Sequence, residues 1–66
     1  SNTARITFQA IAPARDAKIF WFLDDEIIGT TTSGAPMTRT IPMGEHIVRI
    51  ATSDGGGSSA KFTVIQ

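Results

Sequence analysis

Cysteine is absent from the 66-residue sequence, which excludes disulfide bonds, thiolate zinc sites and cysteine nucleophiles. An excess of either charge is also lacking, because six lysines and arginines balance six aspartates and glutamates. A net charge of zero argues against nucleic acid and acidic lipid as partners, since both require clustered cations. We therefore expect no nucleic-acid function.

Long hydrophobic runs are lacking as well. The longest run, Ile19–Leu23, is far shorter than the roughly 20 residues of a membrane-spanning helix, so the chain is not expected to span a membrane. A chain of this length forms one domain and buries only about 60% of its unfolded surface. Residues 1–3 resemble a purification-tag remnant or a disordered lead-in, and we expect the domain to occupy residues 4–66.

Apolar and polar residues alternate along most of the chain, and no segment has helical periodicity. The pattern predicts strands over residues 4–11, 18–23, 26–29, 37–41, 46–51 and 60–64. Turns are expected at Asp24-Asp25 and at the glycine-rich segment 53–58, with a loop over 12–17. The polar segment 30–36 contains β-branched residues and is interpreted as the tail of an edge strand that leads into a loop. This succession predicts an all-β fold, a small immunoglobulin-like antiparallel β-sandwich of about six strands.

The segment 18–23 is rich in aromatic residues and apolar on both faces, which is typical of a central strand. We expect Trp21 to lie in the core, on the same face as Ile19 and Leu23. Phe20 and Phe22 then point to the other face and are candidates for contacting a partner.

His46 is the chain's single histidine and the one candidate for a catalytic base. Its position after Gly44 at a strand entry favours a structural role instead, like the corner tyrosine of sandwich domains. We expect a ring nitrogen of His46 to bond to upstream backbone, and we expect no catalytic residue in this chain.

Two further segments suggest ligand sites. Asp24, Asp25 and Glu26 form the only acidic cluster, but adjacent strand residues point in opposite directions, so a solvated hairpin turn is favoured over calcium. Asp24 and Asp25 remain candidates for partner contact. The segment from Asp54 through Gly55 to Ser58 lacks the lysine and helix of a phosphate-binding loop and is interpreted as a turn. No metal and no cofactor is therefore expected.

Five segments together resemble a known family: Ile19–Asp25, Ile28-Gly29, Met43–Ile50, Gly55 and Ala60–Val64. They are similar to the C-terminal domain of bifunctional (class A) penicillin-binding proteins of the 1C type, over roughly residues 4 to 65. The sequence departs from the family pattern at Asp25, where a hairpin glycine is usual, and at Thr52, where a turn acid is usual.

The resemblance implies a membrane-anchored parent that acts outside the cytoplasmic membrane, in the periplasm, as a peptidoglycan glycosyltransferase and transpeptidase. This chain carries neither active site: Ser58 and Lys61 have the Ser-x-x-Lys spacing but lie on a predicted strand without the partner motifs. The implied role is an accessory domain, and its expected partner is peptidoglycan, an envelope protein or the transpeptidase domain of the same chain.

Two other functions are compatible with the sequence. One is a structural spacer or adhesin-type module of a bacterial surface protein, and the other is a small enzyme that depends on His46. An exposed edge strand over residues 37–41 would also allow dimers by sheet extension.

Overall fold

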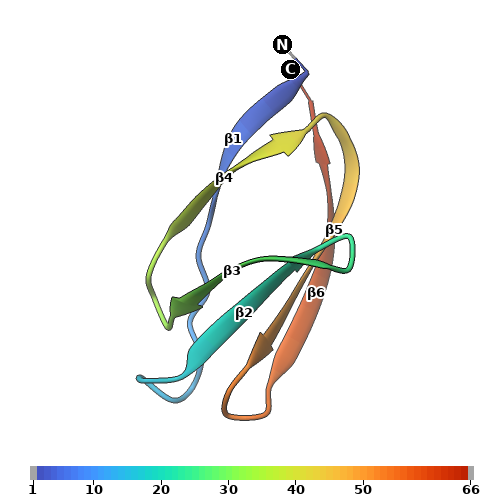
Figure 1. Ribbon diagram of the computed structural model, residues 1–66. Coiled ribbons are helices and arrows are strands. Elements are labelled where there is room, and N and C mark those ends of the chain that lie inside the picture. Colours follow the sequence, from blue (N-terminus) through green and yellow to red (C-terminus); the bar gives the residue numbers. More distant parts are fainter. Residues whose placement is uncertain (1, 66) are drawn as a thin grey trace.

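The computed structural model describes residues 2–65, which form six strands and no helix. The strands are β1 (Thr3–Phe8), β2 (Lys18–Leu23), β3 (Glu26–Thr32), β4 (Met37–Pro42), β5 (Gly44–Thr52) and β6 (Gly57–Val64). β1 pairs with β4, and the other four strands form a sheet in the order β3-β2-β5-β6 (Figure 1). All neighbouring strands are antiparallel, which confirms the predicted small β-sandwich. No helix of the described part is long and apolar enough to cross a membrane.

The strand order corresponds to that of an immunoglobulin-like sandwich. β2, β5 and β6 take the places of its C, F and G strands, and β3 takes that of C′. β1 and β4 take the places of the B and E strands in the facing sheet. Trp21 on β2 therefore occupies the position of the buried tryptophan of such domains, as predicted.

Both sheets contribute to one hydrophobic core. Its buried residues are Phe8, Ile19, Trp21, Met37, Ile41 and Val64. The rings of Phe8 and Trp21 lie 5.6 Å apart, and the Trp21 indole N–H donates to Thr31 Oγ1 at 2.9 Å. Each such side chain contributes about 1.5–3 kcal/mol on burial, so the contact between the sheets stabilises both.

Several strands differ in length from the prediction. The first strand ends at Phe8 rather than at residue 11, because the chain then leaves β4 and the Gln9 side chain donates to the Gly34 carbonyl at 2.6 Å. β3 continues to Thr32, so residues 30–32 are the strand tail and the loop follows them, because these residues pair with β2. β4 and β5 extend by one to two residues at their ends. β6 begins three residues early, which shortens the last turn to residues 53–56.

The two ends of the described chain lie at the same end of the molecule (Figure 1). Thr3 pairs with Pro42 and Val64 pairs with Gly44, so both flank the short link between β4 and β5. β1 begins one residue before the predicted domain boundary, while Ser1 and Gln66 lie outside the described residues.

β3 and β4 approach each other closely although they belong to different sheets. A Cβ atom at Gly29 would lie 2.9 Å from a guanidinium nitrogen of Arg39 and would collide with Met37 Sδ. Arg39 also donates from Nε to the Ile28 carbonyl at 3.0 Å. Glycine at position 29 therefore allows these side chains to close this side of the sandwich.

Candidate functional site

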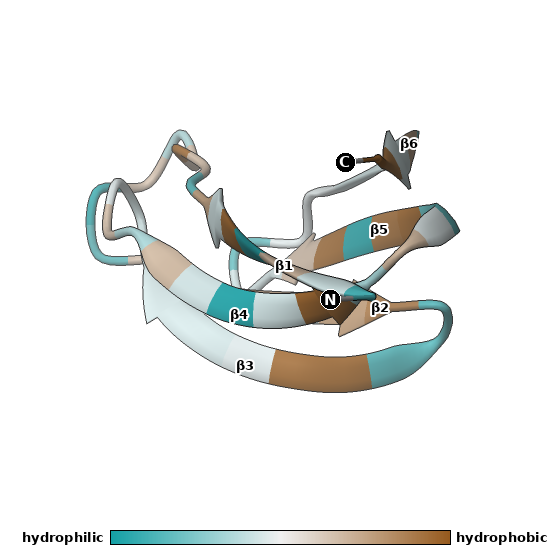
Figure 2. Ribbon diagram, turned by 90° about the horizontal axis from the view of Figure 1, so that it is seen from above, coloured by the Kyte–Doolittle hydropathy of each residue, from teal (hydrophilic) through white to brown (hydrophobic). Residues whose placement is uncertain are grey.

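One face of the four-stranded sheet packs on the core. Among the described residues 2–65 no second layer covers the other face, which we call the outer face. The hydropathy bands along β3 and β5 in Figure 2 show apolar segments beside polar ones on this sheet. Phe20 and Phe22 both lie on the outer face, because they alternate with the buried Ile19 and Trp21. The structure therefore places both predicted contact residues on one accessible surface.

Three residues from other strands join the two phenylalanines. Ile27 of β3 and Arg49 of β5 are the cross-strand partners of Phe22, and Ile47 is a diagonal neighbour. The Arg49 Cζ atom lies 4.3 Å from the centroid of the Phe22 ring, a cation–π contact. Ile27 and Ile47 are 56% and 48% exposed. We call this set the outer patch: Phe20, Phe22, Ile27, Ile47 and Arg49.

The outer face carries more positive than negative charge. Strand alternation places Lys18, Arg49 and Lys61 on it, with Glu45 as the acidic residue among these strand positions. The balanced net charge of the chain therefore conceals a local excess of cations beside the outer patch.

The acidic cluster forms the predicted two-residue hairpin turn between β2 and β3. Asp24 and Asp25 have φ angles of 50° and 70°, so both adopt the left-handed conformation of a type I′ turn. Aspartate tolerates this conformation better than most residues, which explains the turn where the sequence lacks glycine. The turn points the Asp24 carboxylate toward β5.

Asp24 and His46 form a hydrogen-bonded pair. His46 Nδ1 lies 2.6 Å from Asp24 Oδ2, and His46 Nε2 lies 2.8 Å from the Pro42 carbonyl oxygen. The Ile47 amide donates to Asp24 Oδ1 at 3.0 Å. The hydrogen bond from His46 lowers the pKa of Asp24, and the Asp24 carboxylate, followed by the Pro42 carbonyl, raises the pKa of His46.

Both ring nitrogens of His46 face acceptors, so only the imidazolium satisfies both with an N–H donor. The side chain is 11% exposed and packs 5.7 Å from the Phe62 ring. The bond to the Pro42 carbonyl confirms the predicted hydrogen bond from His46 to upstream backbone. Its contact with Asp24 is a further finding of the structure. The pair joins the β2–β3 turn, the end of β4 and the start of β5.

The turn between β5 and β6 is stabilised by its own carboxylate. Asp54 Oδ1 accepts from the Thr52 hydroxyl and from the Gly56 amide, and Oδ2 accepts from the Ala14 amide at 3.4 Å. The Thr52 hydrogen bond is the main cause that lowers the pKa of Asp54. Gly55 has a φ of 94°, which a glycine adopts without strain.

The structure does not assemble a metal site or a Ser-x-x-Lys nucleophile from the residues that the sequence suggested for them. Within residues 2–65 no three of the metal-ligating side chains lie close enough to hold an ion. Asp24 uses both carboxylate oxygens in the contacts above. Ser58 and Lys61 occupy opposite faces of β6, because Ser58 pairs with the inward-facing Ile50 and Lys61 with the outward-facing Ile47.

The sequence did not indicate that Ile27, Ile47 and Arg49 join the phenylalanines. Ile27 reaches Phe22 through the pairing of the consecutive strands β2 and β3, whereas Ile47 and Arg49 depend on β5 lying beside β2, and these two strands are not consecutive in the chain. No family model, no curated protein and no solved structure matches the chain. Its similarity to the penicillin-binding protein domains stays a prediction from the motifs.

Proposed function

We propose that the chain is a non-catalytic accessory domain of a class A penicillin-binding protein of the 1C type. It docks the periplasmic synthase onto peptidoglycan, an envelope protein or the transpeptidase domain of its own chain. The outer patch carries this proposal, because it places the exposed Ile27 and Ile47 beside two half-buried phenylalanines on a face that no other layer of residues 2–65 covers.

The composition of the outer patch supports binding. Aromatic residues and arginine are enriched in interface cores, and Phe22 with Arg49 provides one such pair. The neighbouring Lys18 and Lys61 favour an anionic partner. The sequence motifs supply the link to the penicillin-binding proteins.

Co-sedimentation with isolated peptidoglycan sacculi tests the proposal, at low and at high salt, beside a sandwich domain of similar size. We expect retention above that of the reference domain at both salt concentrations, because apolar contacts are not screened. The double variant Ile27→Ser and Ile47→Ser should lose retention. Ile11→Ser is the matched control, since Ile11 is 82% exposed and lies outside the outer patch.

The outcomes separate the partners. Retention that the double variant preserves would contradict the assignment of the outer patch. If sacculi retain none of the chain, peptidoglycan is eliminated, and cross-linking to the purified transpeptidase domain tests the next partner. A chain that binds neither sacculi, transpeptidase domain nor envelope proteins through the outer patch would leave the spacer as the better function.

A further inference from the structure

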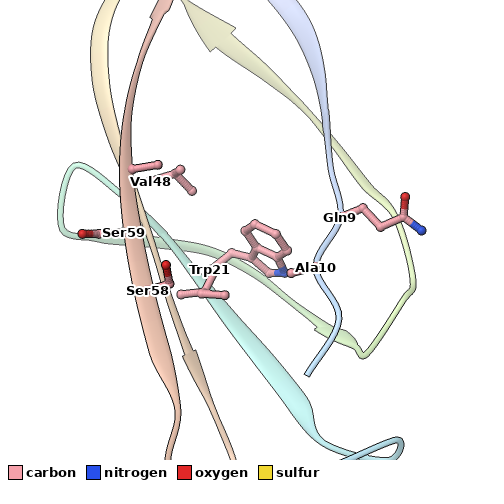
Figure 3. Close-up of a pocket in the computed structure, with 8 residues that line it drawn as sticks. Gln9, Ala10, Trp21, Val48, Ser58 and Ser59 are labelled. Atoms are coloured by element: carbon pink, nitrogen blue, oxygen red, sulfur yellow. The ribbon is translucent and has the colours of Figure 1, made fainter. Parts of the chain in front are cut away.

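The sandwich is open on the side between β1 and β6. A hollow of about 190 Å³ lies there, whereas Arg39 and Met37 close the opposite side. Its floor is Trp21, Val48 and Ile50, and its walls include Ser58 and Ala60 of β6 and Ala10 after β1. Figure 3 shows Trp21 and Val48 between the strand that carries Ser58 and the segment of Gln9 and Ala10.

The size of the hollow indicates what kind of group it accepts. Pockets for drug-sized ligands measure about 300–1,000 Å³, so this hollow is too small for a typical small-molecule site. Ser58 and Ala60 are small and exposed, and they leave room above the apolar floor. The space suits small apolar side chains from an extended peptide.

The free edge of β6 borders this hollow. The Asp24 amide donates to the Ile47 carbonyl, so the backbone groups of Ile47 point toward β2. Backbone groups alternate in direction along a strand, so the odd-numbered residues of β5 bond to β2 and the even-numbered ones to β6. The register then leaves the backbone groups of Gly57, Ser59 and Lys61 pointing away from the sheet. Ser59 lines the hollow although its side chain is on the outer face, in agreement with an accessible backbone.

The charges along this edge are of one sign. Arg5 is the only charged residue of β1 and Lys61 the only one of β6. Arg49 is the cross-strand partner of Ser59 on the outer face. Its guanidinium, however, lies against Phe22 on the β2 side of β5, so Lys61 is the cation beside the outward side chains of a strand added to β6, and it attracts acidic residues. A second copy of the chain would bring its own cations there and be repelled.

We propose that the edge of β6, over residues 57–61, accepts an extended segment of a partner protein in which acidic residues alternate with small apolar ones. The apolar side chains fill the hollow, and the outward acidic side chains lie on the side of Lys61. The backbone of the segment pairs with Gly57, Ser59 and Lys61, adding a fifth strand to the sheet. This site does not depend on what the outer patch binds.

The test uses a capped seven-residue peptide in which aspartate alternates with alanine, titrated into the ¹⁵N-labelled chain. We expect amide shifts centred on Gly57, Ser59 and Lys61, with a dissociation constant of about 1 mM or tighter. A peptide with lysine in place of aspartate should bind at least about fivefold more weakly, because the favourable charge pairs become repulsive.

Variants of the edge separate this site from other surfaces. Ser59→Pro should abolish binding and keep the fold, because the lost N–H points away from β5 and proline is tolerated on sheet edges. Ala60→Leu, which fills the hollow, should also abolish binding and serves if Ser59→Pro does not fold. Lys61→Glu should weaken binding about fivefold. Arg15→Glu, a charge reversal at an exposed residue between β1 and β2, should leave it unchanged.

Four results would overturn the proposal. One is the absence of shifts at ten times the expected dissociation constant. Another is a set of shifts centred on Phe22 and Ile47 in place of β6. Equal binding of the lysine peptide would refute the charge argument. A dimer in sedimentation, together with protection of the β6 amides from hydrogen exchange, would assign the edge to a second copy.

Discussion

At the scale of single residues, His46 makes the stability of the fold depend on pH. Because the pKa of His46 is raised in the folded state, its interactions stabilise the fold fully at pH values below the ordinary histidine pKa of 6.5. This stabilisation is lost as the pH rises through the pKa of His46 in the folded state. Asp24, with a lowered pKa, contributes above its ordinary value of 3.8, and this is lost as the pH falls through its folded value. We therefore expect the midpoint of thermal unfolding to be highest between about pH 4 and 6.5.

Thermal unfolding followed by circular dichroism from pH 3 to pH 9 checks this expectation. His46→Gln should remove most of the fall on the alkaline side, because the chain has no other histidine. The fall on the acid side should persist in that variant, since the lowered pKa of Asp54 also contributes there. An unchanged alkaline slope in His46→Gln would contradict the imidazolium at this site.

Phe8 and Phe22 should respond differently to truncation, although both are phenylalanines on strands. Phe8 is buried against Trp21, so Phe8→Ala should cost about 3–5 kcal/mol, most of the stability of a chain this size. Phe22 is half-buried on the outer face, and Phe22→Ala should cost about 1–2 kcal/mol in urea unfolding. A cost of 3 kcal/mol or more at Phe22 would make it a core residue and remove the basis of the outer patch.

At the scale of elements, the two aspartates of the β2–β3 turn have different roles. Asp25 adopts a φ of 70°, and no hydrogen bond of its side chain is seen in the described residues, so Asp25→Gly should stabilise the chain by up to about 1 kcal/mol. Asp24→Gly should lower the unfolding midpoint, because it removes the acceptor of His46 and Ile47. Differential scanning calorimetry of the two variants compares the same substitution in adjacent positions. Equal changes of the unfolding midpoint in the two variants would show that backbone conformation alone, and not the Asp24 side chain, determines the stability of this turn.

At the scale of the whole molecule, the two sheets share one core and should unfold together. A two-stranded sheet is only marginally stable alone, so β1 and β4 depend on packing against the other sheet. Ile41→Val on β4 should cost about 0.5–1.5 kcal/mol and lower hydrogen-exchange protection in all six strands alike. Loss of protection confined to β1 and β4 would show that the sheets open separately.

Hydrophobic patterning and turn residues made the strands and two of the turns predictable from the sequence. Alternating hydrophobicity indicated four of the strands, the apolar aromatic run 18–23 indicated the central one, and turn chemistry located the Asp24-Asp25 hairpin with β3 after it and the Gly55 turn. The largest errors fell where local signals are weak. The polar segment 30–36 left the end of the strand undecided until pairing with β2 placed it at Thr32, and residues 9–11 leave β1 although their pattern alternates. Pairing, and not propensity, sets these ends.

The sequence by itself determined the fold class, the central place of Trp21 and the position of Phe20 and Phe22 on the opposite face of their strand, because alternation and turn residues act over a few neighbouring positions. Only the tertiary structure decided which strands lie side by side. That arrangement joins Asp24 to His46, Arg49 to Phe22, and β6 to an open hollow. The partners in each case lie far apart in the chain, and no local periodicity encodes a contact that depends on the order of strands in a sheet.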